Sequence, residues 1–137
     1  MPYVLPAQDP RQRTIPPQIL ATLNKLFPEA AELDLLVNEN ELGVSFLWQQ
    51  QYYDAFFTRD GEWLRTEYII DYEELPEQVR FVFELSEYST WERGYAYHVT
   101  LPGRIINYKI YVYDANWNEL ELVYDENGRI VISVSFQ

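Results

Sequence analysis

A single histidine and a complete lack of cysteine restrict the catalytic chemistry open to this chain. General acid–base catalysis most often uses histidine, and a catalytic triad needs a nucleophile and a base beside it. Tyr97 and Val99 flank His98 in an alternating pattern, which places the imidazole on a β-strand as a half-exposed residue. We therefore predict no catalytic residue and no enzymatic activity.

Carboxylates are abundant, with 22 Asp and Glu in 137 residues. Asp54 and Glu121 fall at related strand positions in the two halves of the chain, and two close carboxylates in a deep pocket are the basis of glycoside hydrolysis. Solvation of a sheet surface explains the pair more simply. A carboxylate-driven hydrolase is therefore kept only as the weakest alternative.

The segment from Asp114 to Asn118 has the spacing of the first ligands of a calcium loop, with Asp125 at the twelfth place. Glu119 occupies the position where such a loop needs glycine, and no glutamate closes the loop. A hairpin turn is the better interpretation. We predict neither a metal site nor a cofactor.

The formal net charge of −12 makes phosphate backbones and anionic membranes poor partners. No stretch has the roughly 18 consecutive apolar residues of a membrane span. These features exclude nucleic-acid binding and membrane insertion, and they favour a basic or neutral partner. The proline-rich opening, residues 1–13, is predicted to be an extended arm, and it resembles the start of a mature exported region.

Apolar periodicity in the first half predicts one helix followed by four strands. Ile15-Pro16 opens a segment with apolar residues at helical spacing, which Pro28 ends. The period then changes to two in four successive segments, separated by turn signals such as Asp60-Gly61. These strands are centred on residues 33–37, 42–48, 53–57 and 63–70.

The second half repeats this plan. Leu75-Pro76 opens a second amphipathic helix, and alternating segments follow at 88–101, 108–113, 120–124 and 130–136. Residues 53–61 also align with 120–128 without a gap, which indicates a duplicated unit. We predict an α+β fold: one domain of two repeats, 14–74 and 75–137, whose eight antiparallel strands form one curved sheet with two helices on one face.

One sheet face would then lie open and carry an unusual number of aromatic side chains. With 12 Tyr, 7 Phe and 4 Trp, the chain has the large amphipathic rings that are enriched at interfaces. The strand parity places ten residues on this face: Ser45, Leu47, Asp54, Phe56, Lys109, Tyr111, Tyr113, Glu119, Glu121 and Val123. A contiguous apolar area of this kind indicates a contact surface.

The order of these motifs resembles the PepSY-like, β-lactamase-inhibitor-protein-like family of exported bacterial proteins. The resemblance runs from about Thr14 to Ile132. Its motifs are Ile15-Pro16, Phe27-Pro28, 53–57, 60–64, Leu75-Pro76, 108–113 and 125–128. It implies a tandem repeat whose sheet curves around a concave face, no catalytic activity, and a periplasmic or extracellular location.

The resemblance also implies inhibitor-like binding through the concave face and a protruding hairpin, here Gln49-Gln50-Gln51-Tyr52. This hairpin lacks the acidic tip that would mimic a carboxylate substrate. Our main hypothesis is a non-enzymatic binding module for a protein or peptide; the alternative is a small-molecule or glycan binder that stacks its ligand on tryptophans. The predicted binding residues are Trp48, Gln50, Tyr52, Phe56, Trp91, Tyr111, Tyr113 and Trp117. The uncharged final strand, 131–136, further predicts self-association into a homodimer.

Overall fold

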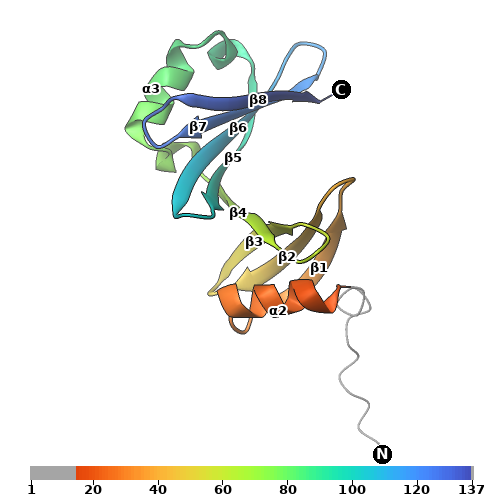
Figure 1. The fold of residues 1–137 in the computed structure, drawn as a ribbon. Helices are drawn as coiled ribbons and strands as arrows, with labels where there is room; N and C mark the ends of the chain where they lie inside the picture. The colour runs from red at the N-terminus through yellow and green to blue at the C-terminus, as the bar shows by residue number, and fades with distance from the viewer. Residues whose placement is uncertain (1–14, 137) are drawn as a thin grey trace, which may run out of the picture. The chain divides into compact units, whose positions relative to one another are not determined.

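The computed structural model describes residues 15–136, with two helices and eight strands in that range. The strands form one antiparallel sheet in sequence order, β1 to β8 (Figure 1). The chain divides into two compact units between Thr66 and Glu67, inside β4. The predicted α+β class and the eight-stranded sheet are thereby confirmed. The predicted arm, residues 1–13, lies outside the described residues.

Unit 1 contains α2 (Pro17–Leu26), β1 (Ala31–Val37), β2 (Leu42–Trp48), β3 (Gln51–Phe57) and the start of β4 (Trp63–Ile70). Proline at the first helical position has the backbone angle that a helix needs and no N–H to leave unpaired. Ile19 and Leu23 of α2 are fully buried against the strands. Their partners on the sheet are Leu42, Val44, Phe46, Ala55 and Phe57.

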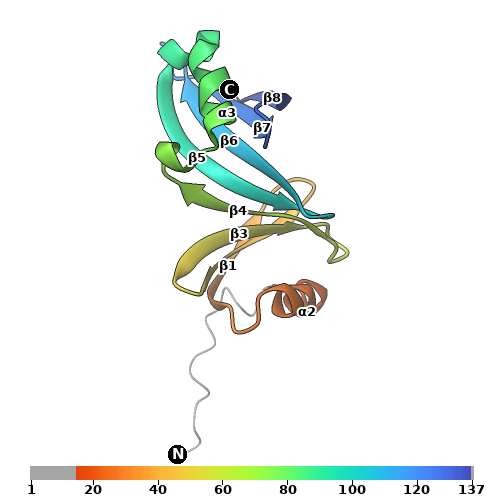
Figure 2. The ribbon, with the colours of Figure 1, turned by 90° about the vertical axis from the view of Figure 1, so that its left-hand side faces the viewer.

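Unit 2 contains the rest of β4, α3 (Glu77–Leu85), β5 (Glu92–Leu101), β6 (Ile105–Tyr113), β7 (Glu119–Asp125) and β8 (Ile130–Phe136). Two 3-10 turns flank α3, η1 (Tyr72–Glu74) and η2 (Glu87–Thr90). Val79 and Phe83 of α3 pack against residues on one face of the strands. Figure 2 shows α3 beside β5 and β6. The strand residues of this core are Ile70, Ala96, Ile110, Val112, Leu122 and Tyr124.

The sequence predicts a strand region from residue 88 onward, whereas the structure begins β5 at Glu92. The reason is local hydrogen bonding by Ser86, whose hydroxyl donates to the carbonyl of Phe83 at 2.6 Å and accepts the N–H of Tyr88 at 3.3 Å. A serine that bonds the backbone in this way favours a turn over a strand. Residues 87–90 therefore form η2.

Three hairpin turns share one hydrogen-bond pattern. The turn that starts at Thr58, the turn that starts at Asp114 and the turn that starts at Asp125 each close with two backbone hydrogen bonds of 2.8–3.1 Å. The fourth residue of each turn has left-handed backbone geometry: Gly61 with φ 94°, Trp117 with φ 62° and Gly128 with φ 86°. The Asp60-Gly61 and Asp125–Gly128 turns, predicted from glycine, are confirmed. The tandem duplication itself stays a prediction.

Candidate binding surface

The face of unit 2 opposite α3 carries alternating tyrosines and charged residues. Ile110 and Val112 of β6 point into the core under α3, so Lys109, Tyr111 and Tyr113 lie on the other face, as the sequence parity predicts. We call this surface the tyrosine face and define it by Tyr97, Lys109, Tyr111, Tyr113, Glu119 and Glu121. The strand register places Tyr97 beside Lys109, Glu121 beside Tyr111, and Glu119 beside Tyr113.

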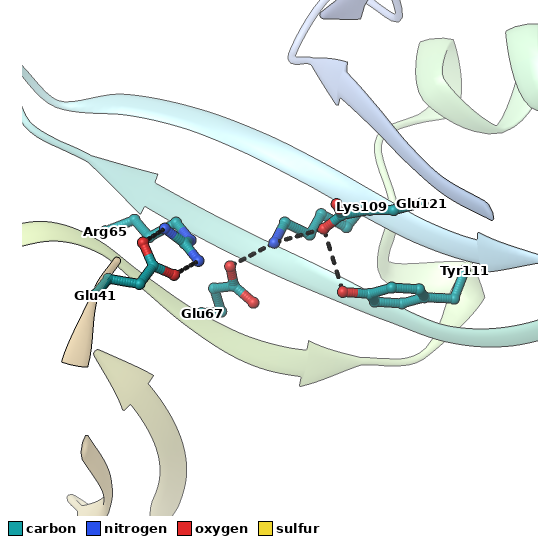
Figure 3. Close-up of polar contacts among 6 residues, drawn as sticks. All are labelled: Glu41, Arg65, Glu67, Lys109, Tyr111 and Glu121. Atoms are coloured by element: carbon teal, nitrogen blue, oxygen red, sulfur yellow. Dashed lines mark hydrogen bonds and ion pairs between the residues drawn. The ribbon is translucent and has the colours of Figure 1, made fainter. Parts of the chain in front are cut away.

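A buried charge cluster lies at the centre of the tyrosine face (Figure 3). The ammonium of Lys109 is 2.5 Å from Glu67 Oε2 on β4 and 2.7 Å from Glu121 Oε1 on β7. All three residues are no more than 8% exposed. Charges taken out of water in this way are tolerated only when they are paired. Strand parity placed Lys109 and Glu121 on this face, but it did not identify Glu67 or Tyr97.

Hydrogen bonds to carboxylates orient two phenols of this face. Tyr111 donates to Glu121 Oε1 at 3.2 Å, and its ring meets Tyr97 edge-on at 5.6 Å. Burial, and then the negative charges of Glu121 and Glu67, raise the pKa of Tyr111. Tyr113 donates to Glu119 Oε2 at 2.8 Å, and this hydrogen bond is the main reason that its pKa is raised. Both phenols therefore stay neutral donors at ordinary pH.

Gly94 of β5 makes room for the ring of Tyr113. A Cβ atom on Gly94 would lie 2.8 Å from Cε2 of Tyr113, so the ring would have to shift to make room for it. Glycine inside a strand often marks such a close approach. Gly94 is therefore a sequence signal for the position of this ring.

Three of the predicted binding residues meet at one end of unit 2. Trp91, Tyr113 and Trp117 line an open cavity of about 430 Å³, together with Thr90, Glu92, Asp114 and Ala115. Trp117 is 69% exposed and its ring lies 5.9 Å from that of Tyr113. Trp91 is half-buried and meets Tyr88 edge-on at 5.1 Å. The structure thus brings together aromatic residues that the sequence only named separately.

Asp114 is held by the turn that it opens. Its carboxylate accepts the backbone N–H groups of Asn116 and Asn118 at 2.8 and 2.9 Å, and the side-chain amide of Asn118 at 3.1 Å. These hydrogen bonds lower the pKa of Asp114. The hairpin-turn interpretation of this segment is confirmed. In residues 15–136, no three His, Asp or Glu side chains gather in a way that suits a metal ion.

The predicted binding residues of unit 1 divide between fixed and exposed side chains. Trp48 donates from Nε1 to the carbonyl of Pro28 at 2.9 Å and packs edge-on against Phe27 at 5.0 Å, so its ring is part of the core edge. Gln50 is exposed and shares left-handed geometry with Gln49 in the β2–β3 hairpin. Tyr52 is 60% exposed.

Phe56 lies on the predicted face of unit 1 but is only 9% exposed. It stands opposite Gly43 in the strand register, and a Cβ atom on Gly43 would lie 2.9 Å from its ring. The guanidinium of Arg65 covers the ring at 4.2 Å. Arg65 also pairs with Glu41 through two hydrogen bonds of 2.7 and 3.1 Å, which Figure 3 shows. The ring of Phe56 is therefore not a free contact surface, because Arg65 covers it. Sequence parity gave the direction of the ring but could not show that a cation lies over it.

His98 lies on the helix side of β5 between two tyrosine rings. It stacks on Tyr68 at 4.7 Å and meets Tyr108 edge-on at 5.4 Å. Burial lowers the pKa of His98, while Glu126 acts in the opposite direction. Its Nδ1 is buried without a hydrogen-bond partner. The predicted half-exposed strand position is confirmed.

A family model described as "Putative beta-lactamase-inhibitor-like, PepSY-like" matches residues 43–131. This chain therefore belongs to the PepSY-like family, as the motif order predicted. No curated protein matches the chain.

Solved structures from Bacteroides have the same fold. A DUF2874 family protein of Bacteroides uniformis has a TM-score of 0.76 at 21% identity, with 88% of this chain and 89% of that chain covered. A BLIP-like protein of Bacteroides fragilis has a TM-score of 0.71 at 20% identity, with 88% and 87% covered. A Bacteroides eggerthii protein, described among "putative periplasmic proteins", has a TM-score of 0.74 at 20% identity, with 88% of each chain covered. Neither helix within residues 15–136 is long and apolar enough to cross a membrane.

Proposed function

We propose that this protein is a non-enzymatic binding module that presents the tyrosine face of unit 2 to a protein or peptide. One observation carries the proposal: Tyr111 and Tyr113 are held in fixed orientations by Glu121 and Glu119 on a sheet face that α3 does not cover. Tyrosines that are already ordered lose little conformational entropy on binding, and rings with a polar tip suit an interface.

Family membership supports the same class of function. The family description and one structural neighbour refer to inhibitor-like proteins, and inhibitors of this kind act by binding rather than by catalysis. We extend this to an inhibitor-like role outside the cytoplasm, in the periplasm or beyond the cell. The neighbour described as periplasmic supports that location.

A peptide-display selection tests the proposal. A phage library selected on the wild-type protein should yield binders that lose affinity for Tyr113→Ala, because this substitution removes one of the two oriented tyrosine rings of the proposed surface. Phe81→Ala is the matched control, since Phe81 is 63% exposed on α3, away from this face. Binders that retain full affinity for both Tyr111→Ala and Tyr113→Ala would exclude the tyrosine face as the contact surface.

A glycan or other small neutral molecule is the second candidate ligand. The exposed ring of Trp117 beside the cavity favours it, because an open indole provides a stacking surface for a sugar. Titration of tryptophan fluorescence against a glycan panel separates the candidates. Saturable quenching by a neutral glycan, lost in Trp117→Gly, would support this alternative.

A further inference from the structure

We propose that the cavity between Trp91, Tyr113 and Trp117 holds the guanidinium or ammonium group of an arginine or lysine side chain from the partner. This inference rests on the proposed binding function and specifies the chemistry that the partner must bring. It concerns one named cavity within unit 2.

Charge favours a cationic occupant. Two of the seven lining residues, Glu92 and Asp114, are acidic, and none of those seven is basic. Glu92 is exposed and stands directly opposite Tyr113 in the register of β5 and β6. Residues 67–137 carry 13 Asp and Glu against 5 Lys and Arg. A partner cation therefore approaches a negative surface and meets aromatic faces beside carboxylates.

The chain itself contains two arginines stacked on aromatic rings, one of which also pairs with a carboxylate. Arg65 in unit 1 stacks over Phe56 at 4.2 Å and pairs with Glu41. Arg93 in unit 2 lies 3.9 Å over the ring of Tyr72. The cavity offers the same combination of aromatic rings and carboxylates, without an arginine among its lining residues. A partner side chain would supply the missing cation.

The backbone at Trp117 is a second reason to assign a ligand to this cavity. The equivalent positions in the two other hairpins with this hydrogen-bond pattern are glycines, Gly61 and Gly128. At both of those positions a helix residue leaves no room for a side chain, because a Cβ atom would lie 2.9 Å from Gln18 Cγ or 2.7 Å from the Gln78 carbonyl oxygen. The third turn has that room, yet a tryptophan in left-handed geometry is uncommon and strained. In this turn the strained backbone holds an exposed indole beside the cavity, and strain of this kind occurs at ligand contacts.

Nuclear magnetic resonance of the four indole N–H groups tests the assignment. The probe is the capped tripeptide acetyl-Gly-Arg-Gly-amide, and its neutral counterpart carries citrulline in place of arginine. Trp48 and Trp63 are internal controls, since their Nε1 atoms donate to the Pro28 carbonyl and to Thr66 Oγ1 within unit 1. The arginine probe should shift the Trp91 and Trp117 signals with a Kd in the millimolar range, and citrulline should not.

Substitutions separate recognition from folding. Trp117→Gly places glycine where the other two turns have it, so the protein should stay folded while the affinity for the arginine probe falls at least about fivefold. Glu92→Gln should weaken binding about threefold without a change of shape. Phe81→Ala on α3 should leave the affinity unchanged.

Three outcomes would overturn the cation assignment. Equal shifts from arginine and citrulline would show that charge is not recognised, and equal shifts from maltotriose would point to a sugar site. Unmoved Trp91 and Trp117 signals at about 50 mM arginine probe would show that the cavity does not bind this cation. If display-selected peptides still bound the tyrosine face in that last case, the proposed function would stand without this inference.

Discussion

The ammonium of Lys109 lies 2.5 Å from the carboxylate of Glu67, which joins β6 to β4 across the intervening strand β5. Lys109 also pairs with Glu121, so one cation serves two buried carboxylates. We expect Lys109→Met to lower the free energy of unfolding by about 3 kcal/mol, because both carboxylates lose the buried ammonium that they share. Urea unfolding measures this loss.

Two further variants define the role of this cluster. Lys25→Met removes an exposed lysine of α2 and should change stability by less than about 0.5 kcal/mol. The triple variant Glu67→Gln, Lys109→Met, Glu121→Gln removes all three charges and should regain much of the lost stability. A loss below about 1 kcal/mol in Lys109→Met would mean that the cluster has little structural importance.

Gly43→Ala should destabilise unit 1 by about 1–3 kcal/mol, because the new methyl group overlaps the ring of Phe56. The double variant Gly43→Ala, Phe56→Ala should show a favourable coupling energy, since the overlap disappears with the ring. Thermal unfolding of the four proteins in this cycle measures the coupling. Additive effects would show that the ring moves aside freely.

Acid should destabilise the fold through His98. Because burial lowers its folded-state pKa below the unfolded value of 6.5, the folded state binds the proton more weakly. The contribution of His98 to stability is therefore complete above pH 6.5 and is lost as the pH falls through the lower folded-state pKa. His98→Phe keeps an aromatic ring between Tyr68 and Tyr108 and should flatten this part of the profile. An unchanged profile between pH 7 and pH 5 would assign the pH dependence to other groups.

Glycine should be tolerated at Trp117 and required at Gly128. Trp117→Gly relieves left-handed strain and should leave stability unchanged or raise it by about 1 kcal/mol. Gly128→Ala should destabilise the protein, since its methyl group would lie 2.7 Å from the Gln78 carbonyl oxygen. The denaturant midpoint of Gly128→Ala should fall below that of the wild-type protein, whereas the midpoint of Trp117→Gly should stay unchanged or rise. A marked loss of stability in Trp117→Gly would show that the indole packs structurally.

The edge strand β8 gives a prediction about self-association. It lies at one end of the sheet order, and Val131 on it is 53% exposed. We expect pairing of two copies along this edge, and Val131→Lys should disfavour it because charged side chains protect edge strands. Light scattering over a concentration series measures the mass. A strict monomer at every concentration would contradict the prediction.

Local sequence signals were sufficient for the elements and their faces. Ile15-Pro16 and Leu75-Pro76 predicted both helix starts, and α2 and α3 begin within two residues of these prolines. Alternation also assigned Lys109 and Tyr111 to the face opposite the core, because side-chain direction in a strand has a period of two. These properties depend on neighbours along the chain, which the sequence displays directly.

Contacts between distant side chains could not be predicted in the same way. The charge on Lys109 was visible, but its pairing with Glu67 required the order of strands across β5. The sequence named Trp91 and Trp117 as binding residues, yet only their position at one end of unit 2 places them around one cavity with Tyr113.

By itself, the sequence determined the α+β class, the absence of cysteine chemistry, the acidic charge and the residues on the two faces of β6 and β7. The tertiary structure decided which of those residues are accessible. Phe56 is covered by Arg65 and pressed against Gly43, whereas Trp117 stays open beside its cavity. The physical reason is that periodicity fixes the direction in which a side chain leaves its strand, while exposure depends on side chains from other strands that pack over it.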